Sequence, residues 1–584
     1  MKFNMSAAGN STMAGTAMNG TTAGAGSTSG AATAAGSRGG GGGGGEVDSE
    51  MLMFNIDIVI LSLLAVLVFL RLPRAIARLW KTSEWTRGHL LWYSRFPGNP
   101  SQRVVWGNDT GLPYTGGDYT TDSSHTLHGT ELQRVSKKGT PIDVSYPPHI
   151  VSTPASFRPM LTLLHKRITP GVSLSHLVIM SIYLGVLIFP AFWETNAFTD
   201  PVRFGWLAVG QYPFVFGFAT KNNILGALMG AGYEKLNFMH RFVGRLVVLS
   251  ANVHGLGYCY KYLLNKTFQE SIARPSNYWG LIALICMDCL FFFSTDFWRK
   301  RAYNIFIATH ISSICLLLAA TMMHKRSTVL WVYATIGIYG LDVLLRIVKT
   351  RFATATVRIL PGLGVTRVEV PDINAGWRAG QHVRVRVFSS GMGLFGWSEI
   401  HPFTIASTAH GPEGLVLMCK KTGSWTRKLY GIAQRPESAY EDGSRKVKVM
   451  IEGPYGGPGH RMFASFSAAV FVVGGSGITF ALSSIQELIQ QDLDGKSRVK
   501  YIHLIWTVQD PCRPKLHEFF ESVIDNVTDM RTGYKDERAI SGVIIGVCGP
   551  VGLADTVFQD VGKVDRRKRD DIGGIEVHEE TFGW

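Results

Sequence analysis

Seven apolar stretches, each about as long as a bilayer is thick, constrain the fold of this 584-residue chain more than any other feature. A helix that crosses a membrane needs about 20 mostly apolar residues. The stretches lie near 53–71, 172–193, 203–220, 238–262, 278–297, 303–324 and 328–348. The third is the least regular, because Gln211, glycines and prolines interrupt it. We expect a multi-pass α-helical membrane domain of about seven spans.

The charges beside the first stretch predict how the chain crosses the membrane. Acidic residues precede it, and four basic residues follow: Arg71, Arg74, Arg78 and Lys81. Positive charge collects at the cytoplasmic ends of spans, so we expect the N-terminus outside and residue 72 onward inside. Seven spans then leave the C-terminus in the cytoplasm. Basic cytoplasmic loops explain the net charge of +15, and we expect no nucleic-acid partner.

Composition divides the rest of the chain. Residues 1–52, rich in Gly, Ala, Ser and Thr, predict a disordered extracellular tail. Its glycosylation sequons begin at Asn4, Asn10 and Asn19 and matter only if the tail is translocated. After the span at 53–71 we expect a cytoplasmic connector (72–168) and the main membrane domain (169–349). Alternating short strands predict an antiparallel β-barrel over 350–458. Strands alternating with helices predict an α/β domain over 459–584.

Two of the apolar stretches each carry a pair of histidines, His240 with His254 and His310 with His324. Fourteen residues of α-helix make almost four turns and rise roughly 21 Å, so both histidines of a pair share one face near opposite ends of a span. The two spans run in the same direction, which sets His240 opposite His310 at the inner depth and His254 opposite His324 at the outer depth. Each facing pair can supply both axial ligands of a haem iron. A lone buried histidine is more often a packing residue, but ionisable groups inside membranes mark functional sites.

Glycine-rich turns in the C-terminal part predict nucleotide binding. One turn follows an apolar strand and opens a helix, as phosphate-binding turns do: Gly474, Gly475, Ser476, Gly477, Ile478 and Thr479. A second group opens a helix whose N-terminus offers N–H groups to a pyrophosphate: Gly423, Ser424, Trp425 and Thr426. A third follows another apolar strand, where a ligand at the carboxyl ends of the sheet would meet it: Cys548, Gly549 and Pro550.

The ordered motifs HPFTIAS, KTGSWT, GPYGG, VVGGSGIT and VCGP resemble the ferredoxin–NADP reductase superfamily. Together with two H-x13-H helices in a membrane domain, they resemble the ferric reductase and NADPH oxidase superfamily. The stretch KNNILGALMGAGYEKLNFMHRFVGR, the seven spans and the ending HEETFGW are similar to fungal ferric-chelate reductases. The resemblance covers about residues 170–584 and leaves out the N-terminal tail.

This resemblance implies FAD, two haem b groups and NADPH as cofactors. It places FAD against His401, Pro402, Phe403, Thr404 and Ser407, with Gly423 to Thr426 at its pyrophosphate. It assigns NADPH to the turn from Gly474 to Thr479 and to Cys548, Gly549 and Pro550. The final Trp584 would lie on the flavin, or would pack as an ordinary C-terminal aromatic residue.

Two assignments stay open. Arg241 and Arg245, one helical turn apart, would pair with haem propionates or an FAD phosphate, or would be ordinary basic residues at the inner end of a span. After the strand YIHLIW the family often has a basic residue for the 2′-phosphate of NADPH, whereas this chain continues TVQD. Arg513 or Lys515 would have to substitute, so NADH stays an alternative.

The implied function is that of a transmembrane ferric-chelate reductase of the plasma membrane, or of the vacuolar membrane. Such a protein moves electrons from cytoplasmic NADPH through FAD and two b-type haems to extracellular ferric chelates or cupric ions, in support of iron uptake. The alternative within redox chemistry is a superoxide-producing NADPH oxidase, which the seven spans and the ending HEETFGW disfavour. A cation channel or transporter is a different class, and the nucleotide-binding motifs argue against it.

Overall fold

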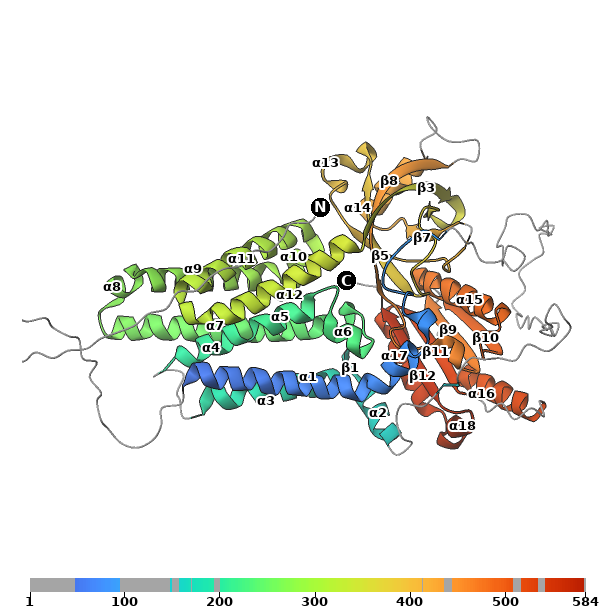
Figure 1. Cartoon of the computed structure of the whole chain (residues 1–584), viewed down its shortest axis with the longest axis horizontal. Helices are drawn as coiled ribbons and strands as arrows, with labels where there is room; N and C mark the ends of the chain where they lie inside the picture. The colour runs from blue at the N-terminus through green and yellow to red at the C-terminus, as the bar shows by residue number, and fades with distance from the viewer. Residues whose placement is uncertain are drawn as a thin grey trace, which may run out of the picture. The chain divides into compact units, whose positions relative to one another are not determined.

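The computed structural model describes residues 48–94, 148–149, 157–169, 171–193, 200–411, 413–434, 444–507, 516–533 and 541–581. The tail through residue 47 and most of the expected connector therefore lie outside the described residues, as do the sequons at Asn4, Asn10 and Asn19. The described residues belong to one compact unit that begins at Asp48. Figure 1 shows it as a layer of long helices joined to two domains that contain β-sheets.

All seven apolar stretches are helical. The spans are α1 (Ser49–Leu79), α3 (Leu174–Phe192), α4 (Val202–Gly210) with α5 (Tyr212–Ala219), α7 (Asn237–Leu264), α9 (Pro275–Phe293), α11 (Tyr303–His324) and α12 (Val329–Val348). Shorter helices join them: α2 (Arg158–His165), α6 (Ile224–Met229), η4 (Tyr233–Lys235), α8 (Phe268–Ala273) and α10 (Asp296–Arg301). A two-residue strand, β2 (Val172–Ser173), pairs with β1 (Arg167–Thr169) just before α3.

Among the described residues, five helices are long and apolar enough to cross a membrane by composition alone. They are α1, α3, α9, α11 and the helix that ends at Val348. Helix α7 is 28 residues long, and its sequence includes both histidines, Arg241 and Arg245. The expected third span differs from a single helix, because it breaks at Gln211 into α4 and α5. The buried side chain of Gln211 accepts a hydrogen bond from the Tyr183 hydroxyl of α3.

The membrane helices share an apolar core that includes Val243, Leu317 and Trp331. Large apolar side chains also cover their outer surface, for example Leu61, Ile285 and Leu316. In water such an apolar surface would be unfavourable, whereas lipid tails solvate it. The chain is a multi-pass membrane protein.

Helix α1 extends to Leu79, eight residues beyond the predicted end of the first span. The basic side chains of its last turns contact the C-terminal part of the protein. Arg74 forms an ion pair with Glu576, and Arg78 donates a hydrogen bond to the carbonyl of Gly459. The chain then runs along the β-domains, and Leu91 is buried in the core of the barrel. We name residues 80–94 the strap. The strap and the C-terminal domains therefore lie on the same side of the membrane, as an odd number of spans requires.

The expected barrel is a six-stranded antiparallel sheet in the order β6-β5-β8-β3-β4-β7. Its strands are β3 (Thr350–Leu360), β4 (Val365–Val370), β5 (Gln381–Phe388), β6 (His401–Thr404), β7 (Leu415–Lys420) and β8 (Arg445–Gly456). An isolated bridge between Ile405 and Leu417 joins the two edges, so the sheet is nearly closed. Every second residue of β5 points inward, including Val383, Val385 and Val387. Two helices, α13 (Gly393–Gly396) and α14 (Ser424–Gln434), complete the domain.

The α/β domain contains a parallel sheet in the order β10-β9-β11-β12. Its strands are β9 (Ala468–Gly474), β10 (Tyr501–Thr507), β11 (Val543–Gly549) and β12 (Ile575–Thr581). The helices are α15 (Ile478–Leu493), α16 (Leu516–Gly533), α17 (Val551–Lys563) and α18 (Arg566–Asp571). Alternate residues of β9 face two cores, one shared with α16 and α17 and the other with α15. Burial on both faces explains the unbroken apolar run of this strand.

Candidate functional site

The four histidines form two facing pairs between α7 and α11. The ring centroids of His240 and His310 are 6.4 Å apart, and those of His254 and His324 are 6.1 Å apart. Each histidine of α7 thus faces the histidine of α11 that the sequence spacing predicts as its partner. Because the earlier histidine of α7 faces the earlier histidine of α11, the two helices run in the same direction.

Hydrogen bonds orient these rings. Nδ1 of His240 donates to the carbonyl of Val215 (3.0 Å) and Nδ1 of His254 to that of Pro201 (2.8 Å). Nδ1 of His324 donates to the carbonyl of Ser276 (2.7 Å), and Nδ1 of His310 lies 3.2 Å from Oγ of Ser294. A carbonyl only accepts, so Nδ1 carries the proton in at least three of the four rings. Their Nε2 atoms keep a lone pair, which is the form that binds a metal.

The spacing of each pair fits a metal held between two imidazoles. A metal–nitrogen bond of about 2 Å on each side, added to the distance from nitrogen to ring centre, separates the centroids by roughly 6 Å. Glycines make room for the outer rings: a Cβ on Gly205 would lie 2.7 Å from Nδ1 of His254, and one on Gly280 would lie 2.6 Å from Nδ1 of His324. The described residues contain no group of three or more metal-binding side chains. A two-histidine site therefore suits a metal whose other ligands come from a porphyrin.

Arg241 and Arg245 are exposed on α7, one turn apart and next to His240. Arg299 and Asp296 of α10 both lie within electrostatic range of Arg241. Within the described ranges, neither Arg241 nor Arg245 forms an ion pair with a carboxylate. Guanidinium groups in this setting are suited to an anionic group such as a propionate or phosphate.

The two barrel motifs expected to hold FAD lie together. The ring of His401 on β6 lies 4.6 Å from the ring of Trp425 at the start of α14, and Phe403 lies 5.8 Å from the same tryptophan. Trp425 is buried in the barrel core and donates from Nε1 to the carbonyl of Gly396. It supports the two motifs from beneath, while Pro402 is exposed and Thr404 is buried.

Two hydroxyls in these motifs already have partners. Oγ of Ser407 donates to the carbonyl of Gly414 and accepts from the N–H of Val416. Oγ1 of Thr426 accepts from the N–H groups of Thr422 and Gly423, which holds the turn that opens α14. Gly423 and Ser424 are exposed at this turn, so the helix N-terminus is open to an anion.

The glycine-rich turn of the α/β domain connects β9 to α15 through η10 (Gly475–Gly477). Gly475 has a φ of +53°, with no atom within 4 Å of where a Cβ would lie. Gly475 and Ser476 are exposed, whereas Thr479 is buried. Ile478 begins α15. The turn therefore presents an open backbone at a helix N-terminus.

The CGP turn lies directly beside it. Cys548 on β11 pairs with Val473 on β9, and a Cβ on Gly477 would lie 2.2 Å from the carbonyl oxygen of Cys548. A Cβ on Gly549 would lie 3.1 Å from the backbone nitrogen of Gly474, and Pro550 begins the connection to α17. The structure thus brings both predicted dinucleotide motifs to the carboxyl ends of adjacent parallel strands.

An aromatic cluster that the motifs did not reveal connects the barrel to the membrane domain. The hydroxyl of Tyr233 lies 3.3 Å from Nε2 of His382, and both rings lie about 6 Å from Tyr455. Tyr233 precedes His240 by seven residues, and His382 pairs with Thr404 of the HPFT strand. Burial and the charge of Arg384 lower the pKa of His382 to about 4, so its ring is neutral near pH 7.

A carboxylate on β8 anchors the same junction. Glu452 accepts hydrogen bonds from Arg346 of α12, from Arg384 of β5 and from the hydroxyl of Tyr455. Burial by itself would raise the pKa of Glu452, but the hydrogen bonds and charges of Arg346 and Arg384 outweigh it and leave the pKa lowered. Glu452 is therefore ionised and ties the last membrane helix to the barrel.

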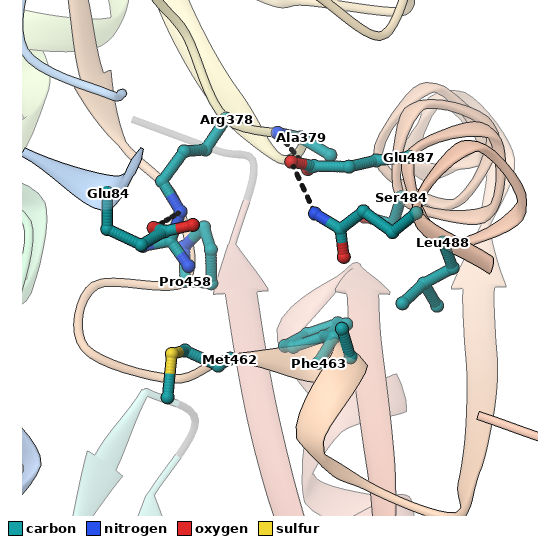
Figure 2. Close-up of a pocket in the computed structure, with 11 residues that line it drawn as sticks. Glu84, Arg378, Ala379, Pro458, Met462, Phe463, Ser484, Glu487 and Leu488 are labelled. Atoms are coloured by element: carbon teal, nitrogen blue, oxygen red, sulfur yellow. Dashed lines mark hydrogen bonds and ion pairs between the residues drawn. The ribbon is translucent and has the colours of Figure 1, made fainter. Parts of the chain in front are cut away.

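A small cavity lies where the strap, the barrel and the α/β domain meet (Figure 2). Glu84 of the strap approaches Arg378 at 3.5 Å, and Glu487 of α15 accepts from the N–H of Ala379 at 2.8 Å. None of the residues predicted to bind a cofactor lines this cavity. It is a contact between domains rather than the predicted site.

Some predicted residues cannot be placed. Trp584 lies outside the described residues, as do Arg513 and Lys515, the candidates for the 2′-phosphate of NADPH.

Comparison with known proteins identifies two regions. Residues 204–321 match the family described as ferric reductase like transmembrane component, and residues 350–459 match an FAD-binding domain family. The chain is 29% identical over 355 residues to ferric reductase transmembrane component 4 of Saccharomyces cerevisiae, covering 57% of this chain and 47% of the yeast protein. It is 26% identical to the probable cell surface ferric reductase kap2 of Aspergillus oryzae, covering 57% and 48%. The chain spans about half the length of these curated relatives.

Solved structures are similar to this chain only at low sequence identity and low TM-score. The ferredoxin reductase of carbazole 1,9a-dioxygenase aligns with 40% of this chain and 70% of its own, at 14% identity and a TM-score of 0.26. A Plasmodium falciparum ferredoxin-NADP+ reductase aligns with 40% and 97%, at 13% identity and a TM-score of 0.25.

The match over α4 to α11 and the match over the barrel follow one another in the order of the chain. They fall on the bundle that holds the four histidines and on the domain that holds His401 and Trp425. Two segments of this multi-pass membrane protein are thus similar to known families, one to the ferric reductase like transmembrane component and the other to an FAD-binding domain.

Proposed function

We propose that the protein is a transmembrane ferric-chelate reductase that uses cytoplasmic NADPH, FAD and two b-type haems. The observation that carries the proposal is the pair of facing histidine sites at two depths of a ferric-reductase-type bundle, with centroid separations of 6.4 and 6.1 Å. Relatives named as ferric and ferric/cupric reductases support ferric chelates or cupric ions as acceptors. The cell-surface relative supports the plasma membrane. The basic residues that follow the first span support an N-terminus outside and a C-terminus in the cytoplasm.

Residues of the membrane helices would bind the haems and the anionic groups of the cofactors. His240 and His310 would hold the inner haem, and His254 and His324 the outer one, each through Nε2. Arg241 and Arg245 would neutralise propionates or an FAD phosphate. When bound, the cofactors supply hydride acceptance and single-electron transfer. Two histidines on one iron leave no open position, which favours electron transfer over oxygen binding.

The β-domains would position the nucleotides. The exposed turns at Gly423 and Gly475 would hold phosphates at two helix N-termini. Both turns belong to domains tied to the membrane part by Glu452 and by the strap. Such ties would hold the hydride-transfer region at a constant distance from the histidine helices, with Tyr233 and His382 between them.

The test uses purified full-length protein and cells that express it. We expect a haem Soret band, a reduced-minus-oxidised difference spectrum with NADPH, and ferric reduction at the cell surface. His254→Leu and His324→Leu should abolish ferric reduction while NADPH oxidation by artificial acceptors continues. Ser312→Ala on α11 is the control, because its hydroxyl bonds only to carbonyls of its own helix.

Three results would contradict the proposal. A missing Soret band would remove the haem assignment. Superoxide production at the outer face without ferric reduction would favour an NADPH oxidase. Full ferric reduction by both histidine variants would show that electrons do not pass these residues.

A further inference from the structure

Glu234 is a buried carboxylate without a partner, located between the membrane domain and the β-domains. It lies in η4, just before α7. Both carboxylate oxygens are shielded from solvent, and neither has a hydrogen-bond partner in the described part of the chain. Burying a carboxylate in this way is costly. A buried carboxylate that lacks a hydrogen-bond partner therefore needs an explanation, and a functional role is one.

Glycines on both sides form the niche. A Cβ on Gly232 would lie 1.8 Å from Oε1 of Glu234, so only glycine permits the carboxylate to fold back over its own loop. A Cβ on Gly456 of the barrel would lie 3.6 Å from the same oxygen and 2.9 Å from Nδ1 of His382. The carboxylate therefore lies between the membrane-domain loop and the GPYGG turn, next to His382.

A second carboxylate, Glu580 of the α/β domain, lies within electrostatic range of Glu234. It is 8% exposed, and its Oε1 lies 2.9 Å from Nε2 of His578. In the parallel ladder Glu580 is the direct neighbour of Cys548 in the CGP turn. Glu580 thus lies at the carboxyl ends of the strands, where the two dinucleotide motifs meet.

The charges around the two carboxyls favour a retained proton. Burial, and then the charge of Glu580, raise the pKa of Glu234, while Lys235 opposes them. Burial also raises the pKa of Glu580, against the charges of Lys235 and Arg461. Two buried carboxyls within electrostatic range of each other disfavour the state in which both are ionised. Tyr233 also lies within electrostatic range of Glu234, and Cys548 within range of Glu580. His578 contacts Glu580, and the neutral His382 lies beside Glu234.

The reaction of the proposed function releases a proton on the nucleotide side of the membrane. One NADPH and two ferric ions give NADP+, two ferrous ions and one proton. The two electrons cross the membrane, and the proton that the hydride carried stays on the nucleotide side. A base would have to accept it beside the flavin ring, which takes up the hydride from the nicotinamide. A carboxylate with a pKa near the working pH is suited to this task.

We propose that Glu234 and Glu580 form the proton acceptor of the hydride-transfer region: the carboxylate pair takes up the proton left by each hydride and releases it to water on the same side of the membrane. This inference rests on the proposed function. It assigns to Glu234, a residue of the membrane domain, a role in chemistry that the motifs place in the β-domains.

The first test reads the carboxyls directly and needs no turnover. Infrared spectra of the full-length protein in lipid nanodiscs are recorded as a function of pH. We expect a protonated-carboxyl C=O band that persists well above pH 4.3, about the ordinary pKa of glutamic acid. Glu234→Gln and Glu580→Gln should each remove one component of this band, measured as the difference between the wild-type and variant spectra. Glu413→Gln, at a carboxyl whose side chain is 51% exposed, should leave it unchanged. Spectra of both variants that match the wild type in this band at every pH would overturn the proposal.

The second test measures the pH profile of NADPH-driven ferric reduction. Glu234→Gln should lower turnover on the order of 10²-fold and flatten the profile. Glu234→Asp, which keeps a titrating group, should recover part of the rate. Unchanged rate and profile in Glu234→Gln would reject the proton role and leave the reductase assignment intact. Absence of ferric reduction in the wild type would reject the reductase assignment, and the infrared result would still report on the retained proton.

Discussion

Arg346 of α12 places two guanidinium nitrogens on Glu452 of β8, at 3.1 and 3.2 Å. The side chain of Glu452 is only 4% exposed, and that of Arg346 is 25% exposed. This two-pronged contact joins the last membrane helix to the barrel strand that ends in the GPYGG turn. The two hydrogen bonds fix the orientation of the guanidinium group against the carboxylate and add to the electrostatic attraction between them.

Glu452→Gln should loosen the barrel from the membrane domain. The substitution leaves Arg346 and Arg384 without their shared carboxylate, and breaking such a buried pair costs about 3 kcal/mol or more. We expect a lower Tm and faster proteolysis near Lys349, measured on the full-length protein. Glu413→Gln, which disrupts a surface pair with Arg367, should change neither. Equal proteolysis of the two variants would show that Glu452 does not anchor the domain.

Glu576 should give the protein an acid-sensitive contact between α1 and the α/β domain. Burial opposes ionisation, but the hydrogen bond from His149 and the charges of Arg74 and Arg461 lower the pKa of Glu576 to about 2. Its contribution to stability is complete above the unfolded pKa of 4.5 and is lost as pH falls toward about 2. The difference corresponds to about 3 kcal/mol at neutral pH.

The measurement compares the Tm of wild type and Glu576→Gln from pH 7 to pH 3. The two proteins should differ most at neutral pH and converge as the pH falls. A constant difference between the two Tm values from pH 7 to pH 3 would mean that the charge of the carboxylate does not contribute to stability.

The spans and the paired histidines could be predicted because both depend on local geometry. A run of apolar residues has to be a helix in lipid, and fourteen residues return a side chain to nearly the same helical face. The strand–turn–helix context of Gly474 to Thr479 was equally local. These features need no knowledge of the partner that each residue meets.

The features that sequence reasoning missed depend on partners far along the chain. Helix α1 continues past residue 71 because Arg74 meets Glu576, about 500 positions later. The break at Gln211 is supported by the Tyr183 hydroxyl of another helix. The sequence around Glu234 does not show that Gly456 of the barrel lies beside its carboxylate or that Glu580 lies within electrostatic range of it. No periodicity or motif records contacts of this kind.

Gly477→Ala should disrupt the dinucleotide site. Its Cβ would lie 2.2 Å from the backbone oxygen of Cys548, and the backbones of η10 and β11 cannot move apart cheaply. We expect NADPH affinity to fall at least tenfold, measured by fluorescence titration of the full-length protein. Gly552→Ala in the first turn of α17 is the control, since no atom lies within 4 Å of its Cβ position. It should be neutral or stabilise the helix by up to about 1 kcal/mol. Unchanged NADPH binding by Gly477→Ala would place the nucleotide elsewhere.

Gly205→Ala and Gly280→Ala should each remove the outer haem and spare the inner one. The added methyl group would lie 2.7 Å from Nδ1 of His254 in the first case and 2.6 Å from Nδ1 of His324 in the second. Either ring has to turn away, which breaks its hydrogen bond to the carbonyl of Pro201 or Ser276 and moves Nε2 out of line. Haem content, measured by absorbance against protein, should fall from two groups per chain to one, and ferric reduction should be lost. Gly217→Ala on α5 has no atom within 4 Å of its Cβ position and should keep both groups. Because both variants leave the histidines themselves intact, retention of two haems in both would show that ring orientation does not decide binding at the outer site.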